Sequence, residues 1–387
     1  MVVGVVQPAR GILKFSEAAP RPAKRRRSAG HPARGCFANR RATGTRGLSV
    51  TATFAAIIPL HNKAPFIERA LHSAIAQTSP ADEIIVVDDA STDGGMILVE
   101  AFAAQHSTQR FTLLHRQQSG PGGYAARNAA VQAAQADWVA FLDADDEWTP
   151  EFVATLRALI DGASRDVGAV FMSRQIVRPD GSEFLQTALR RDLSEPVTMD
   201  FDGFLRLWRA LGRCPMWTSA TAIRRDVLLA AGLFPAARCK RGGDKDTWLR
   251  VMTLTKAIGA PAVGAVYYMN VADQVTRTVT LNQRHCLCDT LLPLIEASRG
   301  ERQRLLKWIF NSEVLNYARW MFGQERIAPE VYRGFYAREN PVLYLALRVV
   351  SLTPLPLQRT LRDVLKGMTG SRAFAWPADV NEAIVRK

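Results

Sequence analysis

Carboxylates gather at one point of the sequence in a pattern that suits a divalent cation. Residues 141–148, FLDADDEW, place Asp143 and Asp145 one residue apart at the end of an apolar run. Hard divalent cations take oxygen ligands, and Mg²⁺ is typically held by one or two carboxylates together with substrate phosphates. Asp143 and Asp145 are therefore candidate ligands. The alternative interpretation is that this acidic loop caps a helix expected after Pro150.

A second acidic pair, Asp88 and Asp89, also follows an apolar run, at residues 83–87. Acidic residues at strand ends can accept hydrogen bonds from the sugar hydroxyls of a nucleotide, so this pair is a candidate for a nucleotide base or ribose. Alternatively, the pair belongs to a polar turn whose Ser and Thr side chains cap the next helix.

A Gly-rich stretch at residues 119–128, SGPGGYAARN, offers a flexible backbone and one guanidinium, that of Arg127. A planar guanidinium matches the geometry of phosphate and carboxylate groups. Arg127 is therefore a candidate to pair with a diphosphate or to orient an acidic strand end. Taken alone, it could equally be a surface cation on a helix.

Short apolar strands alternate with amphipathic helices around these residues. Strands are expected at 54–58, 83–87, 111–114 and 138–142, and helices at 66–77, 96–105 and 124–135. Such alternation predicts right-handed crossovers and a largely parallel sheet. Ligands bind beyond the carboxyl ends of the strands in such sheets. Residues 59–62, 88–93 and 143–147 are polar clusters at those ends, which predicts one shared site.

The alternation loosens after Pro150. Helices are expected at 150–162, at 199–210 and from 226, with strands at 167–175, 216–223 and 262–270. A further polar cluster, RGGDKD at 241–246, precedes an amphipathic helix, and the pattern is helical from about 285 onward.

The net charge of +14 is concentrated in the first 50 residues. These contain eleven Lys and Arg residues against one acid, a charge of +10 that leaves +4 for the other 337 residues. The segment has no helical or strand period, so we expect a disordered basic tail at 1–50. It also lacks the interleaved aromatic residues of a single-stranded nucleic-acid platform, so no specific nucleic-acid partner is predicted.

The cysteines and the hydropathy pattern bear on the compartment. Five scattered cysteines without a C-x-x-C pair predict free thiols in a reducing compartment and no zinc site. The sequence has no apolar run of about 18 residues and no secretory signal pattern. A cytoplasmic protein is therefore expected.

Residues 54–148 resemble a family-2 glycosyltransferase. The resemblance rests on FAAIIPLHNKAPFIERALHSAIAQTSPADEIIVVDDASTDGG followed by GPGGYAARNAAVQAAQADWVAFLDADDEW, whose three motifs agree in order, spacing and strand context. It implies a GT-A fold, which is a Rossmann-like, mainly parallel sheet flanked by helices. It also implies a nucleotide-diphosphate sugar donor carried on uridine diphosphate, a Mg²⁺ or Mn²⁺ ion, and inversion at the anomeric carbon. We expect the catalytic domain at 51–275 and a helical C-terminal extension at 276–387.

The resemblance also assigns roles by position. It implies that Pro59, Leu60 and His61 line the base and ribose pocket, that Asp89 beside Asp88 contacts the base, that Asp143 approaches the ribose or donor sugar, and that Asp145 ligates the metal with Asp143. A later acidic motif supplies the catalytic base in this family. The matching stretch makes Asp244 the candidate and Asp246 the alternative. The chain departs from the family at Gly243, where a Glu is usual, and at His61, where a Tyr is frequent.

Sugar transfer to a hydroxyl of a polysaccharide, lipopolysaccharide or glycolipid is the predicted function. One alternative is a nucleotidyltransferase on a related sheet, which would carry a Gly-rich loop and a Lys directly after the first strand. Residues 59–65, PLHNKAP, lack that Gly-rich loop. Another is a catalytically degenerate binding protein.

The apolar stretch 341–357, PVLYLALRVVSLTPLPL, is broken by Arg348 and two prolines and is followed by Arg359, Arg362 and Lys366. This order suits a helix lying on an anionic membrane, at the inner face of the cell membrane for a cytoplasmic protein. A helical lid or a dimer surface is the alternative.

Overall fold

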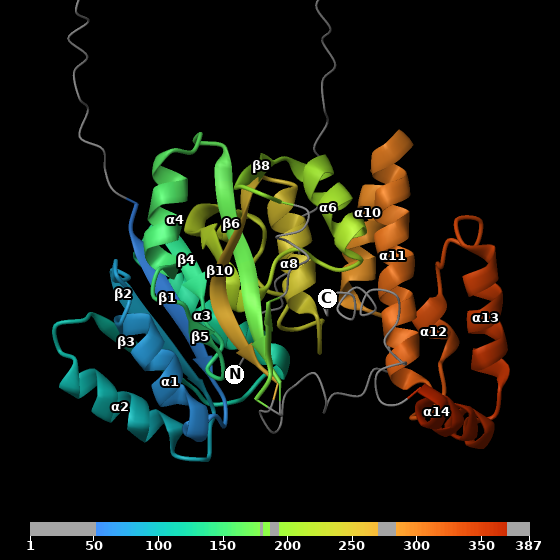
Figure 1. The fold of residues 1–387 in the computed structure, drawn as a ribbon, viewed down its shortest axis with the longest axis horizontal. Coiled ribbons are helices and arrows are strands. Elements are labelled where there is room, and N and C mark those ends of the chain that lie inside the picture. Colours follow the sequence, from blue (N-terminus) through green and yellow to red (C-terminus); the bar gives the residue numbers. More distant parts are fainter. Residues whose placement is uncertain (1–51, 179–180, 186–192, 270–283, 370–387) are drawn as a thin grey trace, which may run out of the picture. The chain divides into compact units, whose positions relative to one another are not determined.

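A ten-stranded sheet with helices on both faces forms the central part of the protein (Figure 1). The computed structural model describes residues 52–178, 181–185, 193–269 and 284–369, so the predicted tail at 1–50 lies outside the described residues. The strands are β1 (Phe54–Leu60), β2 (Glu83–Asp89), β3 (Phe111–Arg116), β4 (Trp138–Phe141), β5 (Glu147–Trp148), β6 (Val167–Val177), β7 (Glu183–Leu185), β8 (Val197–Met199), β9 (Thr221–Arg224) and β10 (Lys256–Tyr268).

Within the described residues, helices alternate with strands in the first half of the chain, and the residues after 284 form helices but no strand. They are α1 (Ala64–Ile75), α2 (Gly95–Gln105), α3 (Tyr124–Ala133), α4 (Phe152–Asp161), α6 (Phe201–Leu211), α7 (Arg225–Ala230), α8 (Gly243–Met252), α10 (Cys286–Ala297), α11 (Gly300–Met321), α12 (Pro329–Tyr332), α13 (Pro341–Leu352) and α14 (Leu355–Thr369). Two short 3₁₀ helices, Pro121–Gly123 and Thr218–Ala220, precede α3 and β9.

The first four strands are parallel and form the predicted alternating unit. β1 pairs with β2 and with β4, and β2 pairs with β3. Nearly every residue of β1 and β2 is buried, because helices cover both faces of the sheet. The strand order is β3-β2-β1-β4. The chain therefore reverses its direction of travel across the sheet between β1 and β4, which is the position where open α/β sheets bind their ligands.

In the second half of the sheet, β6 and β10 keep the direction of β4, while β5, β7, β8 and β9 are antiparallel to their neighbours. β9 lies between β4 and β6 and is antiparallel to both, so β6 and its parallel neighbour β10 run in the direction of β4. The predicted last strand at 262–270 was too short, since β10 begins at Lys256. Gly259 and Pro261 resemble turn residues, but a register shift between Ala260 and Val263 accommodates the proline within the strand.

The sheet separates two apolar cores. Alternate residues of β1 point to opposite faces, so Ile57 and Ile58 belong to different cores. Helices α1, α2 and α4 cover one face. Helices α3, α6, α7 and α8 cover the other, where Trp208 and Trp248 are fully buried.

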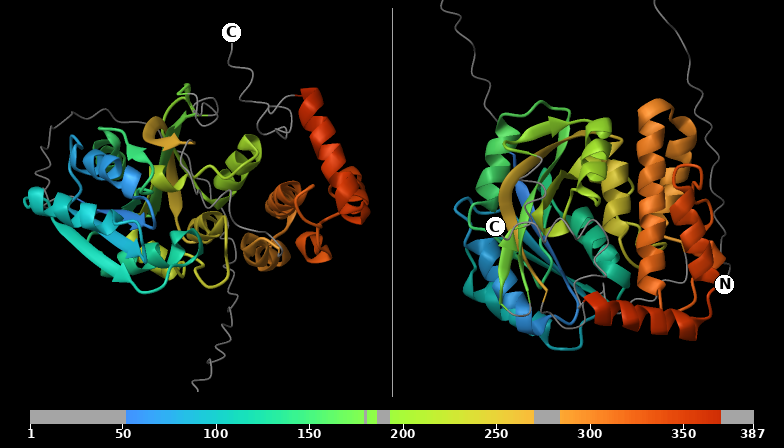
Figure 2. Two further views of the ribbon diagram at one scale, coloured as in Figure 1. Left: turned by 90° about the horizontal axis from the view of Figure 1, so that it is seen from below. Right: turned by 45° about the vertical axis from the view of Figure 1, so that its right-hand side comes forward.

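The C-terminal helices continue the second core instead of starting a new one. Leu291 of α10 and Ile309 of α11 are buried in the same cluster as Trp248 of α8, and Figure 2 shows these helices beside one another. The predicted domain boundary at 275/276 falls within 270–283, outside the described residues. The segment that contains the candidate base is therefore packed directly against the C-terminal helices.

Candidate active site

Three polar loops meet at the edge where β1, β2 and β4 end. The register pairs Leu60 with Asp88, so the residues that follow β1 and β2 leave the sheet side by side. His61 Nδ1 donates to the Asp89 carbonyl oxygen at 2.8 Å. Two non-glycine residues in these loops, Asn62 (φ 50°) and Ala90 (φ 57°), have left-handed backbone conformations. Such strained residues concentrate at functional sites because the surrounding structure must hold them in place.

The carboxylate of Asp89 organises the floor of this edge. Asp89 is 1% exposed, and its two oxygens accept from the Arg116 guanidinium and from the Gly120 backbone N–H, the latter at 3.2 Å. Asp88 is also buried, and it accepts from the Ser91 backbone N–H at 2.9 Å. Both carboxylates thus fix the loop after β2 and the Gly-rich turn. The predicted contact of Asp89 with a nucleotide base would have to share oxygens that are already engaged.

The residues predicted to line the base pocket differ in accessibility. Leu60 is fully buried in the core on the α1 face, so only its backbone faces the strand ends. Pro59 and His61 are more exposed. A Cβ at Gly123 would lie 3.5 Å from Pro59, which shows that the Gly-rich turn and the end of β1 are close together.

Each aspartate of the loop after β4 has a different partner. Asp143 pairs with the Arg127 guanidinium of α3, and Asp145 Oδ2 lies 3.2 Å from Lys63 Nζ. Asp146 Oδ2 accepts from the Ser219 hydroxyl at 2.5 Å. These partners come from the loop after β1, from α3 and from the turn before β9. The aspartate loop is therefore the point where both halves of the sheet meet.

Burial and mutual repulsion disfavour the charged forms of two carboxyl groups in this loop. Burial raises the pKa of Asp145, and the neighbouring Asp143 raises it further, while Lys63 opposes both. Burial also raises the pKa of Asp146 well above its ordinary value, with Asp143 and Asp145 adding to the effect. Asp146 Oδ1 is buried without a hydrogen-bond partner among the described residues. A divalent cation would relieve this repulsion, so the donor set fits a Mg²⁺ or Mn²⁺ ion.

Arg127 is held rigidly between the Gly-rich turn and the aspartate loop. Its guanidinium donates to the Gly122 carbonyl at 2.7 Å as well as to Asp143. Gly122 and Gly123 have φ angles of 67° and 64°, a conformation that favours glycine and that turns the chain into α3. Arg127 is 7% exposed, so its surroundings fix the orientation of the guanidinium before any ligand binds.

Asp244 lies near this group and is uncommitted. It is in the first turn of α8, is partly exposed, and acts electrostatically on both Arg127 and Tyr124. Within the described residues its side chain makes no hydrogen bond or ion pair. Asp246, the alternative base, is 0% exposed and accepts from Arg238 at 2.8 Å and from Arg250 at 3.0 Å. The structure therefore separates a free carboxylate from a structural one, two residues apart.

Steric crowding explains why residue 243 is a glycine and not the usual Glu. A Cβ at Gly243 would lie 2.8 Å from Pro235 Cγ and 2.9 Å from Tyr124 Cζ, and real Cβ atoms do not approach so closely. Tyr124 also accepts the Gly243 backbone N–H at 2.8 Å. A Glu cannot occupy this position while Tyr124 packs here. Asp244 consequently remains as the acid of this turn that points away from the core.

A buried polar network anchors the start of α8. Glu313 of α11 accepts from Lys245 Nζ at 2.9 and 3.0 Å, and His285 Nε2 lies 3.7 Å from the same carboxylate. His285 Nδ1 accepts from the Leu287 backbone N–H at 3.0 Å and so caps α10. Because Lys245 follows Asp244 directly, this network fixes the turn that carries the candidate base.

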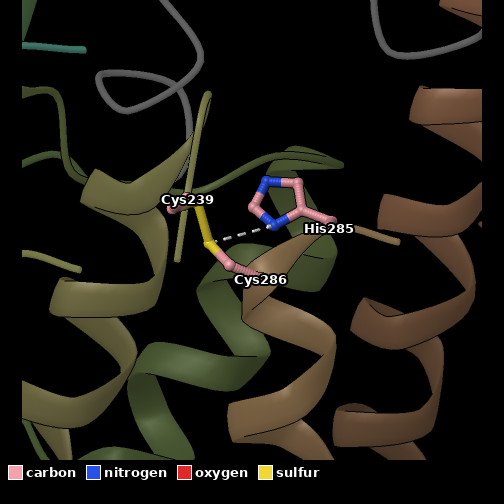
Figure 3. A group of neighbouring side chains, drawn as sticks. All are labelled: Cys239, His285 and Cys286. Carbon is pink, nitrogen blue, oxygen red and sulfur yellow. Dashed lines mark hydrogen bonds between the residues drawn. A yellow bond between two sulfur atoms is a disulfide. The ribbon is translucent and has the colours of Figure 1, made fainter. Parts of the chain in front are cut away.

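A disulfide crosses the same region. Cys239, which precedes α8, is joined to Cys286 at the start of α10, with His285 beside the bond (Figure 3). The prediction that all five cysteines are free thiols was wrong for this pair, because residues 47 apart in sequence are brought together by the packing of α10 on α8. Cys214 and Cys288 are free.

We expect the folded protein to lose stability on acidification through His285. Burial lowers the pKa of His285 to about 4 from its ordinary value of 6.5, although Glu313 opposes the shift. Between about pH 6.5 and about pH 4, His285 is protonated in the unfolded chain but stays neutral in the folded protein. The free energy of unfolding therefore falls by about 3 kcal/mol as the pH drops through this range. His285→Asn keeps a capping acceptor but cannot titrate. Urea unfolding at both ends of the window should show a shallower pH dependence in the variant, and equal slopes would contradict this account.

Sequence reasoning missed several residues that hold the site together. Lys63 and Arg116 contact the predicted site residues Asp145 and Asp89. Ser219 contacts Asp146 of the same loop, and Tyr124 of the Gly-rich stretch holds the Gly243 backbone beside Asp244. Ser219 lies more than 70 positions from its aspartate, and only the insertion of β9 beside β4 brings it there. Lys63 could have been suspected, since it directly follows the polar end of β1.

Comparison with known proteins agrees with this architecture. Residues 55–228 match the family model described as glycosyl transferase family 2. An uncharacterized glycosyltransferase of Nostoc sp. is 31% identical over 172 residues, which are 44% of this chain and 51% of that protein. The succinoglycan biosynthesis protein ExoO of Rhizobium meliloti is 40% identical over 107 residues, 28% of each chain. The chain thus spans about half or less of these curated relatives.

Among solved structures, residues 1–349 of TarS from Staphylococcus aureus in complex with UDP-GlcNAc are similar in fold. The TM-score is 0.62 at 16% sequence identity, over 82% of this chain and 92% of that one. This likeness extends beyond the segment matched by the family model and therefore covers the described C-terminal helices in part.

Proposed function

Since the chain belongs to glycosyl transferase family 2 and has the GT-A fold, we propose that it transfers a sugar from a nucleotide-diphosphate sugar to a hydroxyl group of a saccharide or lipid-linked acceptor. The observation that carries the proposal is the convergence of Asp143, Asp145, Arg127 and Asp244 around the point where the strand order reverses. Uridine diphosphate is the proposed carrier, which the UDP-GlcNAc complex of the TarS structure supports.

The aspartate loop would hold the metal ion. Asp145 and Asp143 would be the ligands, and Mg²⁺ or Mn²⁺ bound there would neutralise charge on the diphosphate. On binding, Lys63 would exchange its contact with Asp145 for one with the phosphates, since it already lies at this carboxylate. Arg127 would place a fixed positive charge at the same position. Groups oriented before the reaction stabilise developing charge most effectively, because no reorganisation is needed when the bond breaks.

Asp244 would act as the general base. A carboxylate that takes the proton from an attacking hydroxyl must be accessible and free of strong partners, and Asp244 meets both conditions. Direct attack by the hydroxyl on the anomeric carbon inverts its configuration and needs no covalent intermediate. The proposal therefore requires no activated serine or cysteine in the site.

The acceptor would belong to a cell-envelope polysaccharide, lipopolysaccharide or glycolipid, as the name of the succinoglycan relative suggests. We place the reaction at the inner face of the cell membrane, where such acceptors are built. The cysteines do not support this placement, because the Cys239–Cys286 disulfide is of a kind that is rare in a reducing compartment. A catalytically degenerate binding protein and a nucleotidyltransferase are the competing functions. The carboxylate of Asp244, unpaired among the described residues, favours sugar transfer over these two functions, because neither of them would need a general base at this position.

Calorimetric titration with UDP tests the donor site directly. We expect the protein to bind UDP more tightly with Mn²⁺ than without it, and Asp145→Ala to abolish the difference. Asp82→Ala is a matched control, because Asp82 is a partly exposed acid paired with Arg157 outside the strand-end loops. Absence of binding to UDP, GDP and dTDP under every metal condition would leave the degenerate binding protein as the better interpretation.

A further inference from the structure

The outward side of helix α13 carries an apolar stripe, with Arg348 exposed at its edge. Leu347 and Ser351 are buried against the neighbouring helices, and Tyr344 stacks on Phe335 with ring centroids 5.7 Å apart. The opposite side carries four large apolar residues at helical spacing, which are 57–76% exposed: Val342, Leu345, Val349 and Leu352. A surface helix of a water-soluble domain normally places polar residues on that side. The arrangement therefore indicates a face that something apolar covers.

Helix α14 extends this face past a bend. Leu357 and Leu361, one helical turn apart, are 51% and 44% exposed. No single described helix is long and apolar enough to cross a bilayer, while Pro341–Leu352 and Leu355–Asp363 reach that length together with a bend of 117° between them. A pair bent so sharply suits two short helices that lie along a surface, each with one side in contact with it.

Charge identifies the kind of surface. Residues 341–369 contain four basic residues, Arg348, Arg359, Arg362 and Lys366, against the single acid Asp363, a net charge of +3. Arg348 and Arg359 are exposed at the edges of the apolar stripe. A second copy of the chain would bring two such cationic faces together. An anionic lipid surface instead offers an apolar interior beneath negative headgroups, and so matches both properties.

We propose that α13 and α14 form a membrane-docking surface that holds the protein on an anionic phospholipid bilayer. Val342, Leu345, Val349 and Leu352 enter the boundary between headgroups and acyl chains, and Arg348 and Arg359 contact the phosphates. The inference goes beyond the donor chemistry and does not depend on it. It accounts for an apolar face that the folded chain leaves uncovered within its described residues.

Flotation of the full chain with vesicles tests the surface. Vesicles of phosphatidylcholine with phosphatidylglycerol should carry the protein, whereas vesicles of phosphatidylcholine alone should carry far less, and high salt should weaken binding. The double variant Leu345→Gln/Val349→Gln should bind anionic vesicles at least about tenfold more weakly, because both side chains lose their apolar contact with lipid. Ile97→Gln/Leu254→Gln is the matched control, since these residues are 69% and 54% exposed on other elements.

The controls make the result decisive. Both double variants keep the basic residues 1–50, so a tail that binds vesicles by charge alone would give equal binding by both variants and would overturn the proposal. Far-UV circular dichroism and the thermal midpoint of each variant verify that it is folded, so the test does not rely on UDP binding. Failure of the wild-type chain to bind anionic vesicles, or self-association that only Leu345→Gln/Val349→Gln abolishes without any vesicle binding, would also overturn it.

Discussion

Replacing Asp244 by Asn is expected to lower kcat by about 10²- to 10⁴-fold, the usual contribution of a general base. The amide has the size of the carboxylate but does not accept a proton at neutral pH. Since Asp244 makes no hydrogen bond or ion pair with the described residues, folding should be unaffected. UDP affinity should also stay close to that of the wild type, because Asp143 and Asp145 are unchanged. Initial rates of UDP release with a saturating acceptor extract, together with the thermal midpoint, measure both effects.

The matched control for this substitution is Asp226→Asn. Asp226 also lies in the first turn of a helix, α7, and its side chain is 70% exposed. Its replacement should leave kcat unchanged. A wild-type kcat in Asp244→Asn would remove Asp244 from the mechanism but would leave the metal-dependent binding of UDP, and hence the donor site, untouched.

The strand-end clusters could be predicted because they depend on local sequence. An apolar run that stops at Asp88 or at Asp143 indicates a buried strand followed by a polar loop. Parallel pairing of the strands then places these loops at the same edge of the sheet. β1, β2, β3 and β4 were confirmed near their predicted bounds for this reason. The family-2 resemblance and the GT-A fold were likewise confirmed, since three motifs in the right order restrict the fold far more than one does.

Contacts between distant segments could not be predicted in the same way. The sequence around Ser219 does not indicate that its hydroxyl reaches Asp146. The local sequence of β9 also does not predict that this strand is antiparallel to β4. The Cys239–Cys286 disulfide was missed for the same reason. It depends on α10 packing against the loop before α8, which is tertiary information.

The two acids of the α8 turn show what burial adds to a motif. By sequence, Asp244 and Asp246 were both candidates for the base, because each precedes the same amphipathic helix. The structure places Asp246 in the core, with two arginines and the Thr290 hydroxyl around it, and leaves Asp244 toward the site. A charge surrounded by partners is poorly suited to exchange protons. We therefore assign Asp246 to the packing of α8 against α10.

Replacing Asp246 by Asn should accordingly destabilise the fold, by about 3 kcal/mol, because removing one partner of a buried ion pair leaves the other uncompensated. Arg250 is the residue most affected, since its guanidinium stays packed against the carbonyls of Ala231 and Leu233. Arg238 is 44% exposed and can turn to water, which favours the lower end of the usual range. Urea unfolding followed by tryptophan fluorescence measures the change against Asp244→Asn, which should match the wild type. If Asp246→Asn instead kept its stability and lost kcat, the assignments of the two acids would have to be exchanged.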